Sequence, residues 1–136
     1  MSALSAAREA TKKDGKLQRM LLKASTQIWK GGIAHTDANG LLVPGSDTSG
    51  NVMAGVAYES ALSASTGSTY ARVEKSGSFL FVAASAVQAW VGFLVYAVDD
   101  QTVALAATTT NDVAAGYCTE VLSATLVRVR IDRAVQ

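Results

Sequence analysis

Histidine and cysteine occur once each in the chain, as His35 and Cys118. A metal cluster built from several histidines therefore cannot form within one chain, and a Ser-His-Asp arrangement would have to use His35. A small hydrolase based on His35 stays open as an alternative, but an ordinary polar residue at a strand end is the favoured interpretation. The lone Cys118 excludes an intramolecular disulfide, and we expect it to be a small buried side chain.

Charge is also scarce, because charged residues make up 17% of the 136 positions and the formal net charge is +1. A chain of this balance is not a general polyanion binder. Neither a G-x-G-x-x-G nor a Walker A sequence is present to hold phosphates. Asp37, Asn39 and Gly40 match a fragment of a calcium loop, but the distant bidentate glutamate is missing. We therefore expect no cofactor, no metal and no nucleic-acid partner, and a protein that is not an enzyme.

The longest stretch without a charged residue runs from Ser76 to Val98 and is long enough to cross a bilayer. Its internal pattern favours two buried strands with a link, because Ser76 and Gly77 open it and Gly92 starts a second run. The N-terminal residues lack the apolar segment of a secretory signal, so we expect neither a signal nor a membrane partner.

Short apolar runs with alternating polarity, separated by glycine- and serine-rich turns, dominate residues 25–136. In the last of them Val127, Val129 and Ile131 fall on one face and the arginines on the other. Roughly ten such runs at close spacing predict an all-β, antiparallel sandwich or barrel. Aromatic residues lie among apolar neighbours, which favours packing in the core or at an interface over base stacking.

Two polar segments are predicted to be turns. Asp37–Gly40 contains an Asn-Gly step, which supplies the positive φ of a tight hairpin. Asp99–Gln101 is the polar gap between two strand-like runs, and aspartate favours turns by bonding its own backbone. Neighbouring carboxylates in a strand would point to opposite faces, so the turn is preferred over a catalytic or metal-binding pair.

The N-terminal residues 1–24 differ from the rest, because residues 1–23 hold six basic and two acidic side chains, a net charge of +4. Leucine and methionine side chains in the same segment have no local partner. We therefore expect a basic arm that becomes ordered on a partner surface, followed by a β body at 25–136. The predicted binding residues of the arm are Arg8, Lys12, Lys13, Lys16, Leu17, Arg19, Met20, Leu21, Leu22 and Lys23.

The sequence from Thr26 to Ile131 resembles the small decoration, or cement, proteins of tailed bacteriophages and prophages. The resemblance is carried by "TQIWKGGIAHTDANGLLVPG", "GSTYARVEKSGSFLF", "GFLVYAVDDQTVAL" and "AAGYCTEVLSATLVRVRID". It implies a compact antiparallel β-barrel or jelly-roll-like sandwich without catalytic residues. The chain departs from the family pattern at Ala61–Ser65 and at Leu126 and Val127, which are positions that could alter contacts with a partner.

The same resemblance implies a structural role in the virion. The protein would be made in the bacterial cytoplasm, bind the outer surface of the assembled shell and stabilise it by bridging copies of the major capsid protein. High apolar content also favours a homo-oligomer, either a dimer or a trimer. The alternative is a surface-adhesion, receptor-binding or carbohydrate-binding β module such as a head fibre, which exposed Trp29, Tyr58 or Trp90 would favour.

Overall fold

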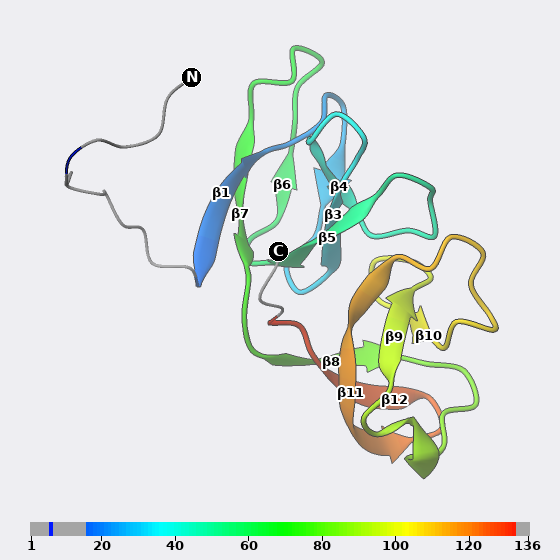
Figure 1. The fold of residues 1–136 in the computed structure, drawn as a ribbon. Helices are drawn as coiled ribbons and strands as arrows, with labels where there is room; N and C mark the ends of the chain where they lie inside the picture. The colour runs from blue at the N-terminus through cyan, green and yellow to red at the C-terminus, as the bar shows by residue number, and fades with distance from the viewer. Residues whose placement is uncertain (1–5, 7–15, 133–136) are drawn as a thin grey trace.

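The computed structural model describes Ala6 and residues 16–132. This part of the chain consists of short strands and one 3-10 helix, and the strand pairings are antiparallel apart from two isolated bridges. The all-β, antiparallel prediction is therefore confirmed. Figure 1 shows two layers of strands, one in the upper half of the molecule and one in the lower half.

The first sheet comes from the N-terminal half of the chain. Its strands are β1 (Leu17–Leu21), β3 (Ile33–Thr36), β4 (Leu42–Pro44), β5 (Val52–Ala57) and β7 (Tyr70–Glu74), in the order β1-β7-β5-β3-β4. A two-stranded sheet joins β2 (Gln27–Ile28) to β6 (Ala61–Leu62). The small-residue segment at 60–68 therefore contributes a short strand.

The second sheet comes from the C-terminal half. Its strands are β8 (Ser78–Val82), β9 (Leu94–Ala97), β10 (Val103–Ala104), β11 (Ala114–Ser123) and β12 (Leu126–Arg130), in the order β10-β9-β11-β12-β8. The helix η1 (Gln88–Trp90) lies between β8 and β9, so the uncharged stretch does form two strands with a link. These strands are buried on one face only, since Leu80 and Val82 are exposed. Among the described residues, no helix has the length and apolarity needed to cross a membrane.

Each sheet curls until its two edge strands meet. In the first sheet, Leu22 directly follows β1 and forms a parallel bridge with Leu42 of β4. In the second, Val82 of β8 bridges Thr102, and its N–H donates to the Gln101 carbonyl at 2.8 Å. Joining the edges reduces the length of strand that could pair with another chain.

Two apolar cores result from this curvature. A small core inside the first sheet consists of Leu22, Ile28, Ala34, Leu42, Ala54, Ala57, Ala71 and Val73. The larger core lies against the second sheet, where Val127, Val129 and Ile131 are buried on one face as predicted. Ile33, Met53 and Val56 reach this core from the first sheet, so it also holds the two layers together.

The two predicted turns are confirmed, and in each the aspartate at the first position organises the backbone. Asp37 Oδ1 accepts the N–H groups of Asn39 and Leu41, and Gly40 has a φ of 77°. Asp99 Oδ1 likewise accepts the N–H groups of Gln101 and Thr102. The pair Asp99 and Asp100 is therefore a turn, and the Asp100 carbonyl accepts the Ile33 N–H at 2.7 Å, which ties this turn to the first sheet.

Candidate functional site

The predicted attachment arm ends in a strand of the body, so its boundary at residue 24 is wrong. Residues Leu17–Leu21 form β1 and pair along their whole length with Tyr70–Glu74. Leu22 is fully buried in the small core, and its N–H donates to the Thr69 carbonyl at 2.8 Å. The apolar side chains of this segment have no partner nearby in the sequence, but the segment pairs with the distant strand β7 (Tyr70–Glu74). Arg8, Lys12 and Lys13 lie outside the described residues.

The other predicted arm residues divide between the two faces of β1. Leu17, Arg19 and Leu21 stand opposite Glu74, Arg72 and Tyr70 on the outer face, whereas Met20 packs against the small core. The Arg19 guanidinium lies 3.9 Å from the centroid of the Tyr70 ring. Lys16 precedes the strand and Lys23 follows it, and both are exposed. These residues belong to a formed surface of the body.

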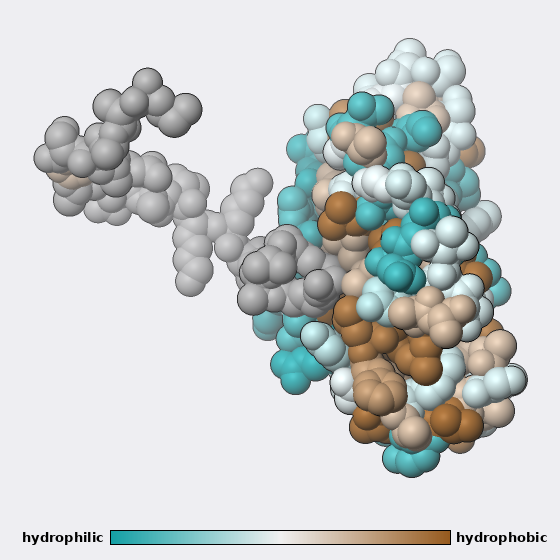
Figure 2. All heavy atoms as spheres, turned by 45° about the vertical axis from the view of Figure 1, so that its right-hand side comes forward, coloured by the Kyte–Doolittle hydropathy of each residue, from teal (hydrophilic) through white to brown (hydrophobic). Residues whose placement is uncertain are grey.

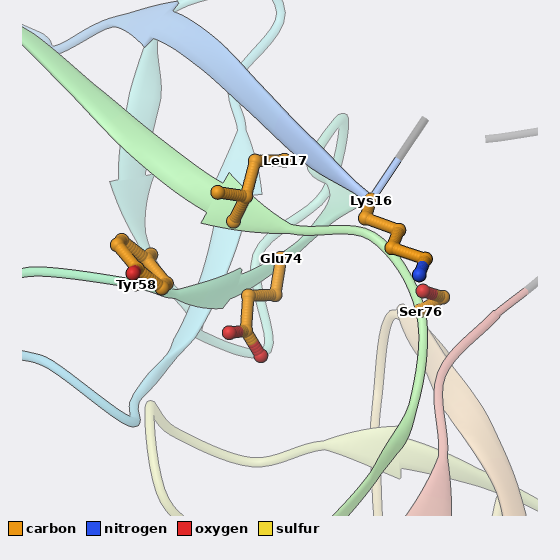
Figure 3. Close-up of a pocket in the computed structure, with 5 residues that line it drawn as sticks. All are labelled: Lys16, Leu17, Tyr58, Glu74 and Ser76. Carbon is orange, nitrogen blue, oxygen red and sulfur yellow. The ribbon is translucent and has the colours of Figure 1, made fainter. Parts of the chain in front are cut away.

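A groove begins beside this strand. Leu17 and Glu74 are register partners on β1 and β7, and they lie between Tyr58 on one side and Lys16 with Ser76 on the other (Figure 3). The pocket formed by these five residues has a volume of about 450 Å³.

The groove continues through two further pockets, each of which shares residues with the pocket before it. The middle pocket, of about 250 Å³, shares Tyr58 and Glu74 with the first and includes Val56, Ala57 and Phe79. The last pocket, of about 430 Å³, shares Lys30 and Gly31 with the middle one and ends at Trp29, Gly32, Asp100 and Gln101. We call the combined surface the aromatic groove, because Tyr58, Phe79 and Trp29 follow one another along it.

Trp29 is held at one end of the aromatic groove by a rigid turn. The Gly32 N–H donates to the Trp29 carbonyl at 3.0 Å, and Gly31 between them has a φ of 85°. Gly31 N–H also donates to the Ala57 carbonyl, and Lys30 N–H donates to the Ser60 hydroxyl. Although its backbone is fixed, the Trp29 side chain is 62% exposed.

Tyr58, nearer the other end, is also fixed in place. The Arg72 guanidinium lies 4.9 Å from the centroid of its ring. Arg72 is in turn held by both carboxylate oxygens of Glu59, at 3.1 Å each, and this contact lowers the pKa of Glu59 and raises the pKa of Arg72. Of the aromatic residues, Trp90 is buried and packs in a core as expected, whereas Trp29 and Tyr58 are exposed.

A second exposed surface surrounds η1. Val87, Val91 and Phe93 are exposed, while Trp90 between them is buried in the larger core and anchors the segment. Phe93 carbonyl and Gly92 N–H bond to Cys118 of β11, so the segment continues the ladder of the second sheet. We call Val87, Val91 and Phe93 the apolar tip. Figure 2 shows hydrophobic residues gathered over the lower half of the molecule, where the second sheet lies.

One feature of the sequence marks this tip, namely the absence of charge from the loop that carries it. The link between β8 and β9 has no charged residue, whereas the loops at 45–51 and 106–112 contain aspartates. Asp47 serves a structural role, since its carboxylate accepts the N–H groups of Thr110 and Asn111 at 2.8 Å each. These bonds lower the pKa of Asp47 and join the two loops.

Cys118 and His35, the remaining candidates for a catalytic or metal-binding role, are buried inside the body. Within the described part of the chain, no three histidine, cysteine, aspartate or glutamate side chains are placed to hold a metal ion. Cys118 is buried as expected, and burial raises the pKa of its thiol. His35 lies near the end of β3, as expected, but it is fully buried, and its Nδ1 accepts the Ser46 N–H at 3.3 Å.

His35 should make the stability of the protein depend on pH. Burial lowers its pKa from 6.5 to about 4, so the unfolded chain takes up a proton at a higher pH than the folded chain does. Stability is then complete above pH 6.5 and falls as the pH drops toward 4. We expect the free energy of unfolding to fall by about 2 kcal/mol between pH 7 and 5, measured by denaturant titration. In His35→Gln the free energy of unfolding should change by less than about 0.5 kcal/mol over the same pH interval. If the variant lost as much stability between pH 7 and 5 as the unaltered protein, His35 would not be the source of the pH dependence.

Comparison with models of protein families, with curated proteins and with solved structures gives no match.

Proposed function

We propose that this protein is a structural component of a tailed bacteriophage particle, a decoration or cement protein that binds the outside of the assembled capsid shell. The observation that carries the proposal is the apolar tip, three exposed apolar side chains on a segment without charge that a buried tryptophan and the second sheet hold in place. The sequence resemblance of residues 26–131 to cement proteins supports the same conclusion. Its partner is the major capsid protein of the same phage, and its location is the outer surface of the virion.

A rigid apolar surface suits a protein that acts by binding alone. The tip is ordered before a partner is present, so binding does not incur the cost of ordering a loop. Burying a valine or phenylalanine side chain contributes about 1.5–3 kcal/mol. A homo-oligomer, either a dimer or a trimer, would engage several shell subunits at once and strengthen attachment through effective concentration. The basic residues Arg8, Lys12 and Lys13 would add long-range attraction and chiefly affect the rate of encounter.

The apolar tip gives a matched test of this function. The double substitution Val87→Ser with Phe93→Ser removes side chains that are 57% and 55% exposed. Its control is Val52→Ser with Leu62→Ser, which removes side chains that are 58% and 67% exposed on other elements. We expect the tip variant to bind shells that lack this protein at least tenfold more weakly, since each ten-fold step corresponds to about 1.4 kcal/mol. The control should bind within about twofold of the unaltered protein.

Co-sedimentation of each variant with purified shells measures these affinities. Equal binding by the tip variant and the control would remove the tip from the attachment surface. Quantitative mass spectrometry of purified virions tests the function itself, because a cement protein must be present at a copy number comparable with that of the shell protein. Absence from the particle would overturn the proposal.

A further inference from the structure

Trp29 is exposed in a way that packing does not explain. Its neighbour Ile28 is buried in the small core and the turn around Trp29 is fixed by three hydrogen bonds, yet the Trp29 side chain itself is mostly exposed. A large apolar ring that stays in solvent gains nothing for folding, whereas it offers a binding surface on a backbone that is already in place.

Tyr58 offers a second ring in the same groove. One contact of this ring is already taken by Arg72, whose position is set by Glu59. The side chain also lines both the first and the middle pocket, so part of it stays available to a ligand. Two exposed aromatic side chains along one groove suit a ligand that is extended and has flat apolar faces.

The polar side chains of the groove narrow the chemistry of this ligand. Lys16 and Lys30 are balanced by Glu74 and Asp100, so the groove lining has no net formal charge. Such a lining does not favour a polyanion or a polycation. It does present ammonium groups, carboxylates, the Ser76 and Tyr58 hydroxyls and the Gln101 amide, which together can donate to and accept from many hydroxyl groups.

We propose that the aromatic groove binds a neutral polysaccharide. The C–H faces of the sugar rings would pack on Trp29 and Tyr58, and their hydroxyl groups would bond to the polar side chains that line the groove. The groove is formed largely by β5, β7 and the turns at 29–32 and 99–101, while the apolar tip belongs to the link between β8 and β9. This activity is therefore additional to attachment and does not rest on it.

Native affinity electrophoresis of the full chain tests the proposal with amylopectin, dextran, mixed-linkage β-glucan and galactomannan as neutral probes, and alginate and heparin as anionic ones. We expect at least one neutral polysaccharide to retard the protein, to the same extent at about 0.1 and 1 M salt because no charge is recognised. Trp29→Ala should weaken retardation at least tenfold and Trp29→Phe less. Tyr117→Ala, which removes an exposed tyrosine outside the groove, should leave it unchanged.

Tryptophan fluorescence supplies a second readout, because Trp29 is exposed and Trp90 is buried. Binding should shift the emission to the blue in the unaltered protein and leave the emission of Trp29→Phe unshifted. Retardation by the anionic probes alone, no retardation by any probe, or equal retardation of Trp29→Ala would each overturn the proposal. Shell binding of Trp29→Ala should stay within about twofold of normal, which separates a failure of this proposal from a failure of the attachment function.

Discussion

Leu22→Ala is expected to destabilise the protein by about 2–5 kcal/mol, in the range found for leucines removed from well-packed cores. Leu22 has no exposed surface and packs in the small core, where several neighbours are alanines that cannot move into the vacated space. It also stands where β1 meets Leu42 of β4, so the cavity would open at the closure of the first sheet. Guanidinium unfolding monitored by fluorescence measures the loss.

Leu17→Ala is the matched control, since Leu17 lies in the same segment but is 39% exposed. It should cost less than about 1 kcal/mol. The comparison separates two interpretations of residues 17–22. If Leu22→Ala kept its stability and lost only shell binding, the segment would be an attachment arm after all, and its integration into the first sheet would be contradicted.

Gly116→Ala is expected to destabilise the protein by about 3 kcal/mol or more, or to prevent folding. A Cβ at this position of β11 would lie 2.2 Å from the Arg130 carbonyl oxygen and 3.0 Å from Val129 Cγ1. Both atoms belong to the neighbouring strand β12, and the backbone oxygen cannot rotate away as a side chain could. The two strands would therefore have to separate, which would disturb the larger core beneath them.

Gly40→Ala adds the same methyl group where it meets nothing within 4 Å. Its cost should be about 1–2 kcal/mol, from the positive φ alone. Circular dichroism and denaturant titration of both variants check the difference. A Gly116→Ala protein as stable as Gly40→Ala would show that β11 and β12 can move apart without loss of packing.

The sequence contained enough information for the features that depend on neighbouring residues. Alternation in the last strand identified its buried face, because successive side chains of a strand point to opposite sides. The Asn39-Gly40 step identified one turn, because glycine readily adopts a positive φ. Asp99 identified another, because an aspartate carboxylate can bond backbone N–H groups a few residues along the chain. The all-β class followed from the sum of such local signals.

The features that depend on distant residues needed the tertiary structure. Leu17–Leu21 carries no clear alternation and appeared to be an arm, but it becomes a strand because Tyr70–Glu74 supplies its partner. His35 was predicted to be a polar residue at a strand end, but only the pairing of β3 with both β4 and β5 shows that it lies in the interior. The groove likewise joins side chains from separate parts of the sequence.

By itself, the sequence determined that the chain forms antiparallel β-structure, where two of its tight turns lie and which face of its last strand is buried. Only the tertiary structure decided that residues 17–22 close the first sheet, that Trp29 and the apolar tip face solvent, and that Tyr58 and Glu74 share a groove with Trp29. The physical reason is range: backbone geometry and turn hydrogen bonds act between near neighbours, whereas strand pairing and burial depend on which distant segments meet.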